Sequence, residues 1–161
     1  MRTSKKVLVI GGLLLSLWGM SYGLYYAVFV EHQTLDTISS ALAASFSNAA
    51  GRKMEASKIN LEGYALASYD YTRQVDVHSH WIGLGMLLIG LGIIFHKVSF
   101  GEELRITLAL ALLIGSALFP VGVLLQTVDR GFLPRLIASI GAALVTVSLA
   151  MVAAGFARSN E

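Results

Sequence analysis

Apolar residues in this chain gather into four long runs, and the segments between the runs carry nearly all of the charged residues. The runs cover about residues 7–30, 77–95, 104–128 and 133–156. A helix of about 20 apolar residues crosses the ~30 Å hydrocarbon core of a bilayer. The pattern therefore predicts an all-α fold, an integral membrane four-helix bundle that forms a single membrane domain over residues 1–161.

The first run follows Arg2, Lys5 and Lys6, and a basic start before an apolar run is also typical of a cleaved signal peptide. The run is longer than a signal-peptide core and no small-residue cleavage pattern follows it, so we interpret it as a retained helix. The third run contains Pro120. Proline is tolerated within a span where neighbouring helices cover the freed carbonyl, so a kink is expected there rather than a break.

The orientation of the spans follows from the charges at their ends. Alternating spans divide the basic residues evenly between the two sides, whereas acidic residues are more numerous on the side away from the N-terminus. Because the first helix usually dominates orientation, we place both termini in the cytoplasm. The chain is then expected to be a multi-pass protein of the bacterial inner membrane. Residues 31–76 then form an extracytoplasmic segment between the first and second spans.

Within that segment, apolar residues recur at helical spacing between residues 34 and 48. They are Leu35, Ile38, Leu42 and Phe46. This spacing predicts a short amphipathic helix that lies on the membrane surface or on the bundle. The rest of the segment, which holds Gly51, Gly63 and several tyrosines, is predicted to be irregular with an aromatic fringe near the headgroups.

The composition narrows the range of functions. Of the residues, 55% are hydrophobic and 14% are charged, whereas soluble domains are about 25% charged, so a bilayer is the natural solvent. The chain has no cysteine, which excludes disulfides, thiolate-bound zinc, iron–sulfur clusters and covalently attached c-type haem. Its twelve Lys and Arg residues are scattered at helix ends rather than gathered in a basic stripe, so no nucleic-acid partner is expected.

Candidate chemistry collects at the extracytoplasmic ends of the spans. Three of the four histidines, His32, His78 and His80, map to that layer, and Gln126 and Arg130 end the third span on the same side. Ionisable groups at membrane depth are costly, so a cluster of them is a functional hypothesis by default. Interfacial packing without any ligand role is the alternative, because histidine is amphipathic and collects at membrane interfaces.

Two arrangements would use these residues. In one, His32 and His80 are the axial ligands of a haem b between the first two spans. Gln126 and Arg130 then bind a haem propionate or a quinone carbonyl. In the other, His32, His78 and His80 hold a single copper, zinc or non-haem iron ion, since imidazole suits all three metals. His78 and His80 are two positions apart, about 200° around a helix, so they cannot both face the bundle if the helix is regular there.

The segment from His78 to Gly85, with the sequence HSHWIGLG, resembles the H-x-H-x-x-x-L-G signature that opens a helix in small multi-helix membrane proteins. It is also similar to helices of the haem–copper oxidase subunit I superfamily. A looser similarity in the third span covers Gly115, Phe119, Pro120 and Gly122. The resemblance implies haem binding through His80 or His78. The superfamily core has many more helices and a copper-binding histidine cluster, so the resemblance implies an accessory or redox subunit rather than an oxidase.

No nucleophile with an adjacent base, phosphate-binding loop or H-E-x-x-H motif occurs in the chain, so hydrolysis and phosphoryl transfer are not expected. The leading hypothesis is a membrane subunit that binds haem b or a metal ion at the extracytoplasmic face and transfers electrons. It would belong to a redox complex, with other membrane subunits or with copies of itself. The alternative is a cofactor-free structural or accessory subunit of a larger membrane complex.

Overall fold

The computed structural model describes residues 2–158, and over these it consists of α-helices and one short 3₁₀ helix. The elements are α1 (Thr3–Phe29), α2 (Glu31–Ala50), α3 (Met54–Ile94), η1 (Phe95–Lys97), α4 (Glu102–Leu125) and α5 (Phe132–Ala157). Four of these helices, α1, α3, α4 and α5, are long and apolar enough to cross a membrane. The predicted all-α class and the four candidate spans are therefore confirmed.

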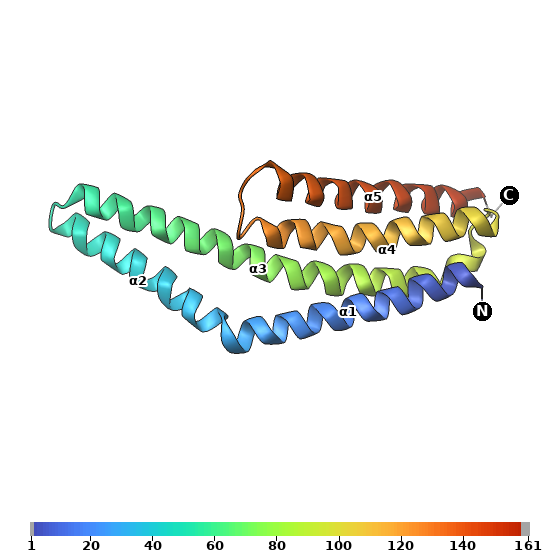
Figure 1. Ribbon diagram of the computed structural model, residues 1–161, viewed down its shortest axis with the longest axis horizontal. Coiled ribbons are helices and arrows are strands. Elements are labelled where there is room, and N and C mark those ends of the chain that lie inside the picture. Colours follow the sequence, from blue (N-terminus) through green and yellow to red (C-terminus); the bar gives the residue numbers. More distant parts are fainter. Residues whose placement is uncertain (1, 159–161) are drawn as a thin grey trace.

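The four long helices lie side by side, and the first turn of α1 and the last turn of α5 lie at the same end of the molecule (Figure 1). We call this end the terminal end. α1 packs along α3, α4 contacts both of them, and α5 packs chiefly against α4. α5 therefore lies outside the group formed by α1, α3 and α4, and the four helices do not close into a symmetrical bundle.

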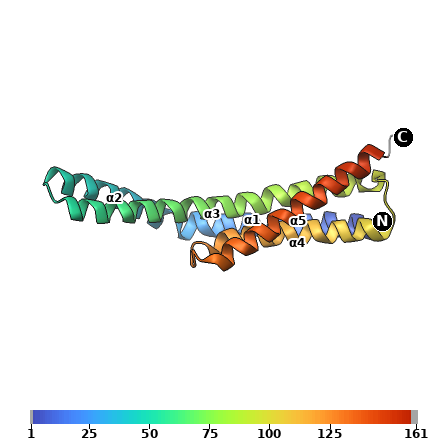
Figure 2. The ribbon, with the colours of Figure 1, turned by 90° about the horizontal axis from the view of Figure 1, so that it is seen from above.

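α3 is the longest element, with 41 residues, which at 1.5 Å per residue is about 60 Å, or twice the thickness of a hydrocarbon core. No proline interrupts its sequence, so the helix can continue. Its first half pairs with α2, and the two project together past the ends of α4 and α5 (Figures 1 and 2). We call α2 and residues 54–70 of α3 the hairpin. The end of the membrane helices from which it projects is the hairpin end.

The hairpin corrects two predictions about the segment between the first two spans. Residues 54–76 are helical rather than irregular, and the second span is the continuation of the same helix. The amphipathic helix predicted for residues 34–48 extends over Glu31–Ala50 and pairs with α3 along the long axis of the molecule. The physical reason is that each helix gives the other a surface to pack against, so the two helices stabilise each other.

Facing glycines bring the membrane helices close together. A Cβ added to Gly12 of α1 would lie 2.6 Å from the carbonyl oxygen of Gly85 in α3, and one added to Gly85 would lie 2.7 Å from that of Gly12. Gly141 of α5 likewise leaves no space for a Cβ beside the backbone of Phe119 in α4. Small residues at helix contacts are the usual means of close packing in membranes, where association depends on van der Waals contact.

α4 continues through the buried Pro120 without a break, as expected for a proline covered by its neighbours. At the terminal end, the backbone N–H and the hydroxyl of Ser4 both donate to Oε1 of Glu102, at 3.1 and 2.9 Å. The Arg105 guanidinium donates to the Val98 carbonyl at 2.6 Å. These contacts join α4 to the start of α1 and to the segment that follows η1.

The glycine contact predicts different effects for two neighbouring substitutions in α3. Gly85→Ala places a methyl group against the Gly12 carbonyl, and we expect it to lower the free energy of unfolding by about 1–3 kcal/mol, the usual cost of overpacking. Gly83→Ala is the matched control, because nothing lies within 4 Å of a Cβ at Gly83. Thermal unfolding in detergent, followed by tryptophan fluorescence, measures the difference. Equal midpoints for the two variants would contradict the close α1–α3 contact.

Candidate functional site

His80 of α3 faces α4. Its Nδ1 lies 2.6 Å from the carbonyl oxygen of Asp76, and its ring meets that of Phe119 edge-on, with centroids 4.8 Å apart. A carbonyl oxygen only accepts hydrogen bonds, so Nδ1 of a neutral His80 carries the proton and Nε2 keeps its lone pair. His80 is thus held between α3 and α4 with a defined tautomer.

The other two candidate histidines face elsewhere. His78 points to α1, where a Cβ added to Gly23 would lie 3.1 Å from the imidazole Cδ2, and its Nδ1 donates to the Gln74 carbonyl at 3.1 Å. The side chain of His32, on α2, is 89% exposed, and its Nε2 lies 3.7 Å from Oδ2 of Asp36. An exposed pair of this kind contributes little to stability.

The structure therefore does not bring His32, His78 and His80 together. His78 and His80 both lie within the regular helix α3, so the offset of about 200° between them directs one to α1 and the other to α4. Within residues 2–158, no group of three or more His, Asp or Glu side chains is placed to hold a metal ion.

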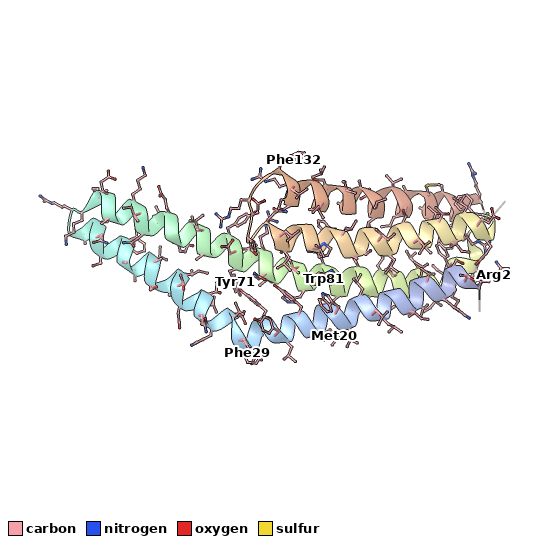
Figure 3. All side chains as sticks on the ribbon, viewed as in Figure 1. Arg2, Met20, Phe29, Tyr71, Trp81 and Phe132 are labelled. Carbon is pink, nitrogen blue, oxygen red and sulfur yellow. The ribbon has the colours of Figure 1, made fainter. Side chains whose placement is uncertain are left out.

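The contact between α1 and α3 at this level is filled by aromatic side chains. Trp81 is buried, and a Cβ added to Gly19 would lie 2.8 Å from the Trp81 Cβ. The rings of Trp18 and Tyr22 meet the Trp81 ring edge-on, with centroids 6.3 and 5.6 Å from it. Figure 3 labels Trp81 on α3, where that helix runs beside α1. The residues present do not fit a haem held between α1 and α3, because no porphyrin-sized space separates these helices here.

Gln126 and Arg130, predicted to bind a propionate or a quinone, instead contact α3. The Tyr69 hydroxyl donates to Oε1 of Gln126 at 3.2 Å, and Arg130 donates to Oδ1 of Asp70 at 3.0 Å. The guanidinium groups of Arg73 and Arg130 each lie 4.9 Å from the centroid of the Tyr69 ring. We call these five residues the Tyr69 cluster. It joins the base of the hairpin to the end of α4 and the loop that follows.

Two further hydrogen bonds join α3 to the α1–α2 junction. The Tyr22 hydroxyl donates to Gln74, and the Tyr71 hydroxyl donates to Oε1 of Glu31 at 3.2 Å. The sequence assigned the tyrosines of the segment 31–76, Tyr71 among them, to an aromatic fringe near the headgroups. The partners of Tyr22 and Tyr71 lie far away in the chain, so only the continuous helix α3, which presents Gln74 and Tyr71 beside α1 and α2, reveals the contacts.

The hairpin itself has no hydrophobic core. Its two buried residues are Ser45 and Ser57. The Ser45 hydroxyl donates to the Ser57 carbonyl at 3.1 Å, and the Ser57 hydroxyl donates to the Ser45 carbonyl at 2.9 Å. Large apolar side chains are exposed on both helices instead. They are Leu35 (41% exposed), Phe46 (69%), Met54 (65%), Ile59 (66%), Leu61 (50%) and Leu66 (49%).

The chain matches no family model, no curated protein and no solved structure. The similarity of the segment from His78 to Gly85 to haem-binding helices therefore stays a prediction.

The Tyr69 cluster predicts how the hairpin base responds to substitution. Tyr69→Leu removes the ring between the two guanidinium groups and the hydrogen bond to Gln126, so we expect a loss of roughly 1–2 kcal/mol of local stability. Tyr69→Phe keeps the ring and should lose less. Hydrogen–deuterium exchange of residues 126–131 in detergent measures the effect. Unchanged exchange in Tyr69→Leu would show that the cluster does not hold the base.

Proposed function

We propose that the protein is a membrane-anchored accessory subunit whose hairpin, on the extracytoplasmic side, docks another protein chain. The observation that carries the proposal is the missing core of the hairpin. It buries two serines between its helices and leaves large apolar side chains exposed on both. Exposed apolar surface of this kind, outside the membrane-spanning part of a protein, is typical of an interaction site.

The energetics of a two-helix hairpin support the proposal. Helices of this length draw most of their stability from tertiary packing, so a pair that buries no large apolar side chain is marginal in water. Full burial of a side chain such as that of Phe46, Met54 or Leu61 contributes about 1.5–3 kcal/mol. A partner that covers these side chains therefore stabilises the hairpin through the same contacts by which it binds.

The base of the hairpin supports a docking role in a second way. The Tyr69 cluster and the hydrogen bond between Tyr71 and Glu31 hold the hairpin on the membrane helices. α3 then continues from the tip of the hairpin into the membrane without a break. A partner thus meets a surface whose position above the bilayer is set in advance, which lowers the entropic cost of binding.

Site-specific photocrosslinking tests the docking role. A photoreactive phenylalanine analogue at Phe46 should link the full-length chain to a protein partner in intact membranes. The same analogue at Ser40, also exposed and about 120° away around α2, is the control and should not. Leu61→Glu should abolish the adduct at Phe46. Equal labelling from both positions, or no adduct from Phe46, would contradict docking through this surface.

Electron transfer through a haem b or a single metal ion is the second candidate. The observation that favours it is the hydrogen bond from His80 Nδ1 to the Asp76 carbonyl, since metal-ligating histidines usually fix their second nitrogen in this way. His32 and His78 face elsewhere, so another chain would supply any further ligand to such a group. A quinone bound by Gln126 and Arg130 has less support, because both side chains are engaged in the Tyr69 cluster.

A reduced-minus-oxidised visible spectrum with metal analysis tests this candidate on purified protein expressed with ample haem and metals. Ligation through His80 predicts that His80→Ala loses the haem or metal and that His32→Ala keeps it, because His32 is exposed away from that position. Loss of the haem or metal in both variants would instead support His32 and His80 as the two ligands. Wild-type protein without stoichiometric haem or metal would rule the candidate out.

A further inference from the structure

Two contacts define how the helices of the hairpin are aligned. Ser45 lies opposite Ser57, and Glu31 lies opposite Tyr71. In both pairs the residue numbers add to the same total, so α2 and α3 run antiparallel without slipping relative to each other.

This alignment arranges the apolar residues of the hairpin in layers, of which Leu35, Phe46, Met54 and Leu61 are exposed and Leu42 is half-buried. Phe46 lies within about one turn of the level of Met54, and Leu42 lies one residue from the level of Leu61. Leu35 adds a third layer nearer the membrane. Leu35 and Leu42 are seven residues apart, and so are Met54 and Leu61. A seven-residue repeat is the spacing of a coiled-coil seam.

The layers lie on one flank of the hairpin. At about 100° per residue, Leu42 and Phe46 are turned about 60–100° to one side of Ser45, and Met54 and Leu61 about 40–60° to the same side of Ser57. Because the helices are antiparallel and face each other, equal rotation places both sets on the same flank. We call it the apolar flank.

The opposite flank of the hairpin carries a groove, and its lining residues are consistent with the rotation used to place the apolar residues. A groove there is lined by residues of both helices. They are Val30, Gln33, Thr34, Thr37, Ala67 and Asp70. On the same rotation, Thr37 and Ala67 are each turned about 80° to the other side of Ser45 and Ser57, so they belong to the flank opposite the leucines. We call it the groove flank.

We infer that the chain docked by the hairpin is a second copy of this protein, and that two hairpins join through their apolar flanks into a four-helix bundle outside the membrane. The inference rests on the proposed docking function. Two copies inserted in the same orientation project their hairpins side by side from one surface. A twofold axis along the membrane normal then sets α2 of one copy beside α3 of the other, so equal layers meet and the contact is isologous.

The size of the apolar flank is adequate for such a dimer. α2 has 20 residues, so the flank is about 30 Å long and, at two helix diameters, about 20 Å wide. This footprint is about 600 Å² per copy, at the lower end of the roughly 600–1,000 Å² per partner of specific stable interfaces. Membrane anchoring adds to this by holding the two copies at the same height and at high effective concentration.

The charges favour the apolar flank over the other exposed apolar stripe. Ile59 and Leu66 lie on the back of α3, away from α2, and Glu55 and Glu62 flank them at the same seven-residue spacing. A twofold pair through that stripe would set like carboxylates opposite each other, which is destabilising. On the apolar flank the charged residues are Lys58 and, at the end nearer the membrane, Glu31, which accepts a hydrogen bond from Tyr71. The twofold axis brings Lys58 beside a stretch of α2, residues 37–50, without charged residues.

Cysteine crosslinking tests the inference cleanly, because the chain has no cysteine of its own. Two full-length forms with different tags, one Leu42→Cys and one Leu61→Cys, are expressed together and oxidised in isolated membranes. We expect a band that carries both tags at twice the mass of the 17.2 kDa chain. Ser40→Cys with Gly63→Cys is the matched control at the same spacing on the groove flank. It should give none of this band.

Each outcome decides between the two proposals, provided that the cysteine variants elute like the wild type in detergent. A band with both tags from Leu42→Cys and Leu61→Cys, and none from the control pair, supports the dimer. No such pair, or equal yield from the control, overturns it. If the photoreactive analogue at Phe46 then links to a different protein, the docking function survives and self-association does not. If Phe46 links to nothing, both proposals fail.

Discussion

The packing of α3 against α1 determines where every other part of the molecule lies. α3 contacts α1, α2 and α4, and the approach of Gly12 to Gly85 sets how closely α1 and α3 lie together. In a bilayer the lipid tails are as apolar as leucine, so helices are held by close van der Waals contact and not by removal from water. Because α3 is a single helix, the packing of its second half against α1 and α4 also sets the position of the hairpin.

The same close packing restricts the chemistry of the hairpin end. Trp81 fills the space between α1 and α3 that a flat cofactor would need. Several polar side chains near it have hydrogen-bond partners within the protein, as most buried polar groups do, whereas the buried hydroxyl of Tyr26 has none in the part of the chain that the structure describes. The Tyr69 cluster takes up Gln126 and Arg130, and backbone carbonyls take up Nδ1 of His78 and of His80. These polar contacts therefore hold the helices together at this level of the molecule.

The weakness of the hairpin and its exposed apolar surface have the same origin. Ser45 and Ser57 are small, so the two backbones approach closely and exchange hydrogen bonds. Large apolar side chains such as Phe46, Met54 and Leu61 lie beside this contact and are exposed. A helical pair built in this way has little internal stability and a large apolar surface. Burial of that surface by another chain, as proposed above, would supply the missing core.

The sequence alone determined the all-α class, the number of candidate spans and the divergence of His78 and His80, because each depends on apolar run length or helical rotation along one segment. It also marked Leu35, Leu42 and Phe46 as one face of a helix. Only the tertiary structure decided that residues 54–76 continue α3, that Tyr69 binds Gln126, and that the leucines of two helices share a flank. Periodicity reports which side of a helix is apolar. It does not report which helix lies beside it, since that depends on contacts between residues far apart in the chain.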